Sequence, residues 1–179
     1  LISTGNTDGI FQIESAGFKK FLKDLQPTCI EDIVAAVSLY RPGPMSYIPV
    51  YVHNKDHPED TKYDHALLEP ILNVTYGVIV YQEQVMRICQ NLAGFSLGQA
   101  DMIRRAMGKK KMEEMLKWKE AFLHGREAYT DNHGKYNPPI IGAINNGVSE
   151  EVANKIWSDM EAFASYAFNK SHAAAYSLI

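Results

Sequence analysis

The sequence has 179 residues, of which 46% are hydrophobic and 22% are charged, and its formal net charge is −3. This length is enough to bury a core, and no apolar run approaches the roughly 18 residues that a membrane-spanning helix needs. The N-terminal residues lack the charged, apolar and small-residue regions of a signal peptide, and there are only two cysteines. We therefore expect one compact, soluble, cytoplasmic domain over residues 1–179. We expect neither a membrane protein nor a secreted domain stabilised by disulfides.

Helix signals dominate the chain from its N-terminal end. Apolar residues between Phe11 and Leu25 recur at intervals of three, four and seven, which predicts one helix that ends near Gln26. Patterns of the same kind recur along the sequence. We therefore predict a mainly α fold of several helices, with one short strand or hairpin.

Residues 28–81 combine a second helix with irregular sequence. Thr28 followed by Glu31 has the pattern of a capping box, and the helix that it begins must stop at 41–44, where two prolines lack backbone donors. The pattern then weakens over 45–68, which we expect to be a solvated loop or a small irregular hairpin. The apolar run 78–81 is typical of a short buried strand.

Four further helices are predicted, over 82–93, 96–108, 112–128 and about 149–163. Gly94 is expected to end the first of them, and Ser96 with Gln99 forms a capping box for the next. Residues 129–147 are rich in Asn, Gly and Pro, and we predict a loop insertion there. Both ends of the chain lie in patterned sequence, so we expect a piece of a longer protein.

The cysteines and histidines do not predict a metal site. Cys29 and Cys89 each lie among apolar neighbours without another Cys or His at ligand spacing, so we expect two buried thiols. His53 and His57 have the spacing of two ligands on one helix face. However, the residues between them do not predict a regular helix, and no cysteine is near. We therefore expect no metal ion bound by this chain.

A dense cluster of cations lies at 104–111. It holds five Lys and Arg residues and no acid, whereas the rest of the chain has 13 Lys and Arg against 21 Asp and Glu. Cations in the last turn of a helix also complement its dipole, and that ordinary explanation stays open. Because adjacent helical residues point about 100° apart, Arg104 and Arg105 can flank one phosphate from two sides. We predict a phosphate-binding edge made of Arg104, Arg105, Lys109 and Lys110.

The segment 169–172 opens a final predicted helix. A lysine at a helix N-terminus opposes the dipole, whereas Asn169 and Ser171 are good caps there. A bound phosphate would compensate for Lys170, and the alternative is a lysine that points into water. His172 can donate to a phosphate or a base, or simply face solvent.

The residues do not predict a catalytic centre. No glycine-rich phosphate loop and no nucleophile with an assigned base can be found in the sequence. Adjacent acids at 113–114 and 150–151 point in different directions on a helix and do not form a metal-holding pair. The residues alone therefore predict binding rather than catalysis.

Five motifs run through the chain in a fixed order: GIFQIES (9–15), LYRPGP (39–44), TYGVIVYQEQVM (75–86), ADMIRRAMGKK (100–110) and FASYAFNKSHA (163–173). Each motif alone is a modest signal. Together, and at this spacing, they resemble the fingers region of the alpha subunit of bacterial DNA polymerase III, a replicative C-family polymerase. The resemblance covers almost the whole chain.

The resemblance implies a helical fingers domain that folds over the incoming deoxynucleoside triphosphate and lines the templating site. It places Arg104 and Arg105 by the triphosphate and, less directly, Lys109 and Lys110. The segment 169–172 is expected to face the same nucleotide-binding cleft, and Arg41 and Gln82 are expected close to that cleft. The full set of expected site residues is Arg41, Gln82, Arg104, Arg105, Lys109, Lys110, Asn169, Lys170, Ser171 and His172.

The resemblance also implies what the chain lacks. The three metal-binding aspartates of the family belong to the palm, upstream of Leu1, and neither Asp8 nor Asp101 matches one of them. We therefore expect no catalytic residue and no cofactor in this chain, Mg²⁺ in the palm of the parent enzyme, and no polymerase activity from the chain alone.

The implied parent enzyme is a DNA-directed DNA polymerase, a nucleotidyltransferase. Its implied partners are primer-template DNA, deoxynucleoside triphosphates, the rest of the polymerase chain and replicase subunits such as the sliding clamp, without a membrane. One alternative is a helical nucleic-acid-binding module with no enzymatic context, whose cations follow a phosphate backbone. Another is a structural domain whose cations are solvated.

Overall fold

A computed structural model gives the fold of the chain and describes residues 2–109, 112–164 and 166–177. The mainly α prediction is confirmed, and short 3₁₀ turns connect several of the helices. The helices and strands are α1 (Ala16–Leu25), α2 (Ile30–Leu39), α3 (Ile48–Asp56), α4 (Glu69–Leu72), α5 (Gln82–Ala93), α6 (Leu97–Gly108), α7 (Met112–His124), β1 (Tyr129–Thr130), β2 (Tyr136–Asn137), α8 (Glu150–Ala164) and α9 (Lys170–Ser177).

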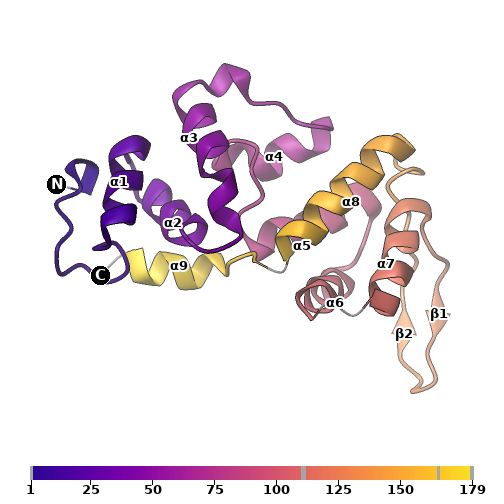
Figure 1. Cartoon of the computed structure of the whole chain (residues 1–179). Helices are drawn as coiled ribbons and strands as arrows, with labels where there is room; N and C mark the ends of the chain where they lie inside the picture. Colours follow the sequence, from indigo (N-terminus) through magenta and orange to yellow (C-terminus); the bar gives the residue numbers. More distant parts are fainter. Residues whose placement is uncertain (1, 110–111, 165, 178–179) are drawn as a thin grey trace.

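The helices form an elongated body, and the first and last described segments, α1 and α9, lie at the same end of it (Figure 1). The last helix, α9, packs against α2, so it returns to the N-terminal end of the molecule. Helices α5, α6, α7 and α8 pack together at the other end, and the antiparallel pair β1 and β2 projects from them. The chain thus extends from one end of the body to the other and then returns with α9.

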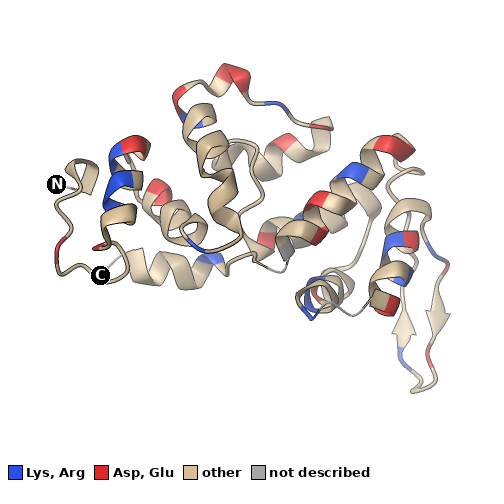
Figure 2. Ribbon diagram, viewed as in Figure 1, with Lys and Arg blue, Asp and Glu red and all other residues tan. Residues whose placement is uncertain are grey.

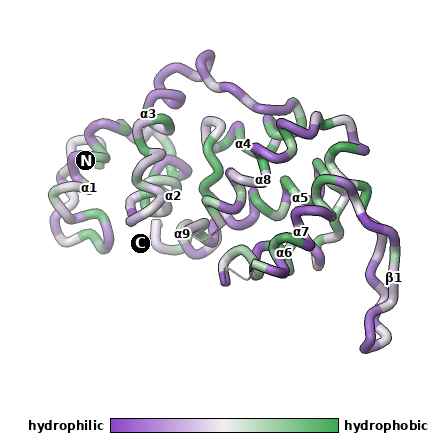
Figure 3. The backbone as a smooth tube through the Cα atoms, turned by 45° about the vertical axis from the view of Figure 1, so that its right-hand side comes forward, coloured by the Kyte–Doolittle hydropathy of each residue, from purple (hydrophilic) through white to green (hydrophobic). Residues whose placement is uncertain are grey.

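Large apolar side chains fill one continuous core. Phe18 of α1, Tyr51 of α3, Phe122 of α7 and Trp157 of α8 are all fully buried in it. The projecting hairpin is hydrophilic and does not contribute its strands to this core (Figure 3). Among the described residues, no helix combines the length and the apolar character that a bilayer span requires.

Local capping signals place several helix ends where the sequence predicts them. The hydroxyl of Ser96 accepts from the N–H of Gln99 at 3.3 Å, and the Gln99 side chain accepts from the N–H of Ser96 at 2.9 Å. Gly94 ends α5 with a φ of 75°, a conformation that glycine adopts without strain. Ser149 caps α8 by accepting from the N–H of Val152 at 3.3 Å. These predictions are confirmed.

The predicted start of the first helix is wrong. Helix α1 begins at Ala16, after Ser15 caps it by accepting from the N–H of Phe18, and Phe11 lies outside it with 66% of its surface exposed. The reason is Gln12, whose φ of 68° is left-handed and cannot occur inside an α-helix. The apolar spacing that joined Phe11 to the stripe is therefore coincidental.

The capping box of α2 lies one residue later than predicted. The Asp32 carboxylate accepts from the N–H of Thr28 at 2.8 Å and from that of Cys29 at 3.4 Å, so Cys29 is the cap. This position leaves Cys29 exposed, which contradicts the prediction of a buried thiol. Cys89 is buried in α5 as predicted, and burial raises the pKa of its thiol to about 12.

The predicted loop over 45–68 contains a helix, α3. Its first turn holds a proline, a position that proline tolerates, and Tyr51 anchors it by packing edge-on against Tyr76 at 5.2 Å between ring centroids. The expectation of no helix between His53 and His57 is therefore wrong. His53 contacts Asp60 at 2.8 Å, and no group of three or more His, Cys, Asp or Glu in the described part of the chain lies close enough to hold a metal ion.

The run 78–81 is buried as predicted but is not a strand. It makes a single parallel bridge, between Tyr81 and Phe168. The side-chain oxygen of Gln84 accepts from the N–H groups of Val80 and Tyr81, at 2.8 and 2.9 Å, and so takes the place of a neighbouring strand. Residues 129–147 contain the β1–β2 hairpin, and their status as an insertion stays a prediction.

Candidate functional site

Arg104 of α6 connects three parts of the chain that are distant in sequence. Its Nη1 donates to Oε1 of Gln82, the first residue of α5, at 3.1 Å. Gln82 in turn donates from Nε2 to the carbonyl oxygen of Ala167 at 3.2 Å, and from its backbone N–H to that of Phe168 at 3.0 Å. The predicted residues Arg104 and Gln82 therefore lie together beside the segment that leads into α9.

Asp101 holds both arginines of the predicted phosphate-binding edge. Arg104 donates to Oδ1 from Nε at 2.9 Å and from Nη2 at 2.7 Å, while Arg105 donates from Nε to Oδ2 at 2.8 Å. The bond from Arg104 is the main reason that the pKa of Asp101 lies below its usual value. Arg104 is mostly covered, with 24% of its side chain exposed, whereas Arg105 is 66% exposed.

Arg41 also contacts the segment before α9. Its Nη2 donates to the carbonyl oxygen of Tyr166 at 2.7 Å, and its guanidinium lies over the ring of Phe168, 4.3 Å from the centroid. Burial lowers the pKa of Arg41, but an arginine stays charged at neutral pH. Arg41 therefore contacts the segment that leads into α9, and its expected position at a nucleotide cleft stays a prediction.

The N-terminus of α9 already has an anion beside it. The backbone N–H of Lys170 donates to both carboxylate oxygens of Glu83, each at 3.3 Å. The compensating negative charge that a lysine at this position requires is therefore supplied by α5 of the same chain. The side chain of Lys170 points elsewhere, with Nζ 5.4 Å from the centroid of the Tyr81 ring.

The other residues of the 169–172 segment are exposed. Asn169 caps α9, as predicted, because its Oδ1 accepts from the N–H of His172 at 2.9 Å. The His172 ring stands edge-on to Tyr176 with 4.6 Å between centroids. Ser171 and His172 keep their side chains at the surface, where a ligand can reach them.

The structure does not gather all the predicted cations around one hollow. Arg105 and Lys109 border a hollow of about 410 Å³ between α6, α7 and the start of β1, here named the α6–α7 hollow. Lys170 and Ser171 border a different one, of about 320 Å³, beside α5. Arg104 lines neither of these two hollows, and Lys110 falls outside the described residues.

The residues of the α6–α7 hollow were partly missed by sequence reasoning. Besides Arg105 and Lys109, its lining includes Met102, Ala106, Glu114, Lys117, Trp118, Arg126 and Tyr129. Lys117 and Arg126 belong to no recognised motif. They meet Arg105 only because α7 packs against α6, a contact that no local pattern encodes.

The family model for the bacterial DNA polymerase III alpha subunit finger domain matches residues 1–129 of the chain. The chain belongs to this family. Curated relatives named DNA polymerase III subunit alpha match the whole chain with 48% identity in Thermus aquaticus, 47% in Halalkalibacterium halodurans and 48% in Chlamydia muridarum. The chain spans 13 to 14% of the length of these relatives.

Asp101 does not fit a Mg²⁺ site. Both of its carboxylate oxygens pair with arginines, whose positive charges would repel a second cation there. The described acids form no larger cluster that could hold a metal. What the site contains is a pair of arginines held in place by Asp101, one of them also by Gln82.

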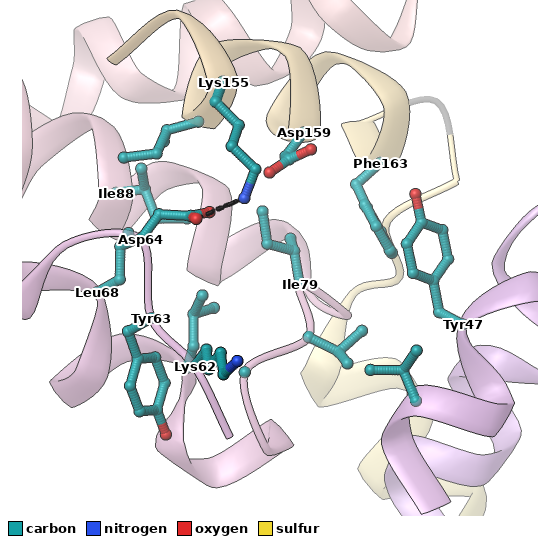
Figure 4. A pocket seen from close by; sticks show the side chains of 15 residues that line it. Tyr47, Lys62, Tyr63, Asp64, Leu68, Ile79, Ile88, Lys155, Asp159 and Phe163 are labelled. Carbon is teal, nitrogen blue, oxygen red and sulfur yellow. Dashed lines mark hydrogen bonds and ion pairs between the residues drawn. The ribbon is translucent and has the colours of Figure 1, made fainter. Parts of the chain in front are cut away.

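A separate, mainly apolar cavity of about 410 Å³ lies between α8 and the segment 62–79 of the finger domain (Figure 4). At its edge, Lys155 of α8 pairs with Asp64, 91 residues earlier in the chain. The carboxyl group of Asp159 lies beside this pair, and burial raises its pKa above the usual value. The hydrogen bond from Lys155 to Asp64 raises the pKa of the lysine.

Proposed function

We propose that this finger domain binds the triphosphate of the incoming nucleotide within a DNA-directed DNA polymerase, with Arg104 as the central contact. The observation that carries the proposal is the link from Arg104 through Gln82 to the carbonyl oxygen of Ala167. This link supports a shared role for the RRAMGKK and NKSH motifs, because it ties the helix that carries one to the segment that begins the other.

In this proposal the domain acts by electrostatic positioning. Arg104 is held by Gln82 and Asp101 before any ligand arrives, so little reorganisation is needed to meet a phosphate. Arg105 is more exposed and adds a second guanidinium, whose fork suits phosphate oxygens. Lys170 contributes through its Nζ rather than through the helix N-terminus, since Glu83 occupies that position.

The remaining parts of the reaction belong to the rest of the polymerase chain. We assign the catalytic carboxylates and their Mg²⁺ to that part, together with most of the primer-template contact. Mg²⁺ held by those carboxylates would supply positive charge to offset the negative charge of the phosphates. Contacts with other replicase subunits, including the sliding clamp, are proposed for the whole enzyme and not for particular residues of this domain.

The test uses the complete polymerase subunit that carries this domain. Arg104→Ala should raise the KM for deoxynucleoside triphosphate, or lower kcat, so that kcat/KM falls by about 10-fold to 100-fold. Arg104→Lys keeps the positive charge but loses the forked guanidinium. Its kcat/KM should therefore lie between that of Arg104→Ala and that of the unaltered enzyme. Lys20→Ala on α1, an exposed cation at the other end of the body, serves as the control.

Nucleotide kinetics that are unchanged in both Arg104 variants would contradict the proposal. A loss of DNA affinity with unchanged nucleotide kinetics would instead favour the alternative of a nucleic-acid-binding module that follows a phosphate backbone. The two hypotheses also differ in the salt dependence of DNA affinity. If the cations follow a DNA backbone, their removal should make DNA affinity less dependent on salt, because fewer counterions are released on binding.

A further inference from the structure

The α6–α7 hollow has a strong excess of positive charge. Among its described lining residues are four cations, Arg105, Lys109, Lys117 and Arg126, and one acid, Glu114. Figure 2 shows Lys and Arg on both α6 and α7, the two helices that border the hollow beside the projecting hairpin. A concave surface with this charge concentrates anions.

Arg126 in this hollow has hydrogen-bonding capacity that the protein does not use. Its Nε and Nη2 are buried and have no hydrogen-bond partner. Buried donors without an acceptor are rare in folded proteins, and each one calls for an explanation. A ligand that brings oxygen acceptors explains these two.

Two aromatic rings and the backbone hold Arg126 in place. Its guanidinium lies 5.1 Å from the ring centroid of Trp118 and 4.6 Å from that of Tyr129. Its backbone exchanges two hydrogen bonds with Ile140, at 2.9 and 2.8 Å, at the base of the hairpin. The charge is therefore fixed at the wall of the hollow.

The hollow adjoins the proposed triphosphate contact but faces a different neighbouring helix. Adjacent residues on a helix diverge, so Arg104 turns towards Gln82 and α5, whereas Arg105 turns towards α7. Arg105 uses Nε for its contact with Asp101. Arg105 therefore lies where the triphosphate contact and the hollow adjoin, whereas Lys117 and Arg126 belong to the hollow.

We propose that the α6–α7 hollow binds the sugar-phosphate backbone of single-stranded template DNA; this inference rests on the proposed function in a polymerase. The hollow is lined by the rings of Trp118 and Tyr129 as well as by cations, and a duplex keeps its bases stacked inside, out of reach of such rings. Cations combined with aromatic side chains are the usual features of single-strand sites. Beyond the hollow, the hairpin adds Tyr136, which is 63% exposed and can stack on a base.

Binding requires a small rearrangement at the rim of the hollow. Side chains cover Nε and Nη2 of Arg126, so a phosphate oxygen reaches them when an exposed side chain turns aside. Lys109 and Lys117 are exposed, and Tyr129 on β1 is 42% exposed. These residues meet the phosphate first, and Arg126 supplies the fixed charge behind them.

The test measures DNA affinity of the complete polymerase subunit by fluorescence anisotropy. The two probes share one duplex, and only one of them carries a single-stranded 5′ template overhang of about ten nucleotides. Arg126→Met, which keeps an apolar stem between the rings, and Lys117→Gln should each weaken binding of the overhang probe by about 5-fold to 20-fold. Affinity for the blunt probe should stay within about twofold. The exposed Lys117 keeps the test valid if Arg126→Met fails to fold.

The salt dependence gives a second measurement. Loss of one phosphate contact to a single strand should reduce the slope of log affinity against log salt by about 0.7. Lys119→Gln, on the same helix but outside the lining of the hollow, is the matched control and should leave both probes unaffected.

Each other outcome overturns the inference. Equal weakening of both probes would assign the hollow to duplex DNA, and unchanged affinities would mean that it does not bind DNA. A higher KM for nucleotide without any change in DNA affinity would assign it to the triphosphate. Failure of the Arg104 experiment is distinguishable from all of these, because that experiment measures nucleotide kinetics and not dependence on the overhang.

Discussion

Arg104 donates a hydrogen bond to the side-chain oxygen of Gln82 at 3.1 Å, although 22 residues separate them. The amide nitrogen of the same Gln82 donates to the carbonyl oxygen of Ala167, 85 residues later. One side-chain amide therefore aligns α6 with the segment before α9. Gln82 is a positioning residue, because it acts on a phosphate only through the arginine that it holds.

Gln82→Leu removes both bonds while keeping an apolar stem of similar length. It leaves a donor of Arg104 and the Ala167 carbonyl oxygen without these partners, so the free energy of unfolding of the chain should fall by about 1–3 kcal/mol. In the complete polymerase, kcat/KM for nucleotide should fall by about 10-fold, because Arg104 is no longer held in place. Urea unfolding and steady-state kinetics measure the two effects.

Gln90→Leu is the matched control for this variant. Gln90 lies on the same helix and is partly buried, but its side chain takes no part in the Arg104 cluster. Similar kinetic losses in the two variants would show that α5 matters only for folding, and the positioning role of Gln82 would be rejected.

Glu83 should stabilise α9 through its charge. Glu83→Gln keeps the size of the side chain but removes the anion beside the N–H of Lys170, so α9 should lose about 0.5–1 kcal/mol at low salt. The backbone amides of the first turn of α9 should then exchange with solvent about 2-fold to 5-fold faster. Hydrogen exchange measured by NMR tests this result.

The Glu83 effect is electrostatic, so added salt should reduce the difference between the variant and the unaltered chain. Glu127→Gln, at an exposed position near the hairpin, should leave the exchange of α9 unchanged. Equal exchange rates at Lys170 in all three proteins would mean that the carboxylate does not cap this helix.

The parts of the fold that sequence predicted well depend on neighbouring residues. Ser96 and Gln99 cap α6 over three residues, and Gly94 ends α5 where a left-handed conformation is needed. Such signals operate within one turn of chain, so the sequence contains them in full. The predicted start of α1 was wrong because apolar spacing does not report backbone conformation. The spacing of Phe11 matched the apolar face of the helix, but no sequence pattern reveals the left-handed conformation of Gln12.

The candidate site likewise has a part that the sequence predicted and a part that only the fold reveals. Its cations were visible as clusters, and the resemblance placed Arg41 and Gln82 near them. What sequence could not provide was the partners: Asp101 could be seen beside the arginines, but Glu83 meets Lys170 across 87 residues. The α6–α7 hollow is a stronger case, because Arg126 and Arg105 share it only through helix packing.

Gly142 should be needed for the base of the hairpin. Its φ is 87°, and a Cβ built on it would lie 2.3 Å from the backbone nitrogen of Gly125, an atom that cannot turn aside as a side chain does. Gly142→Ala should therefore lower the free energy of unfolding by at least about 2 kcal/mol. Gly147→Ala is the control: its φ is 92°, but nothing lies within 4 Å of the added Cβ.

The difference between these two alanine variants isolates the steric clash from the backbone strain that both share. Thermal unfolding should give a clearly lower Tm for Gly142→Ala than for Gly147→Ala. Equal losses would mean that the close approach of the two backbone segments contributes nothing to stability.

Asp159 beside the apolar cavity gives a prediction about pH. Because burial raises its folded pKa, the folded state binds the proton more tightly than the unfolded state does, and stability falls as the pH rises through that folded pKa. Asp159→Asn removes this cost, so the variant should be more stable at pH 7 by up to about 1 kcal/mol, a modest figure because solvent still reaches the group. The gain should vanish below about pH 4, where both states of the unaltered chain are protonated. Urea unfolding between pH 4 and 7 measures this difference in the free energy of unfolding, with Asp24→Asn, at an exposed position, as control.

A variant that is less stable than the unaltered chain at pH 7 would contradict this prediction. It would mean that attraction between Asp159 and Lys155 outweighs the cost of burial.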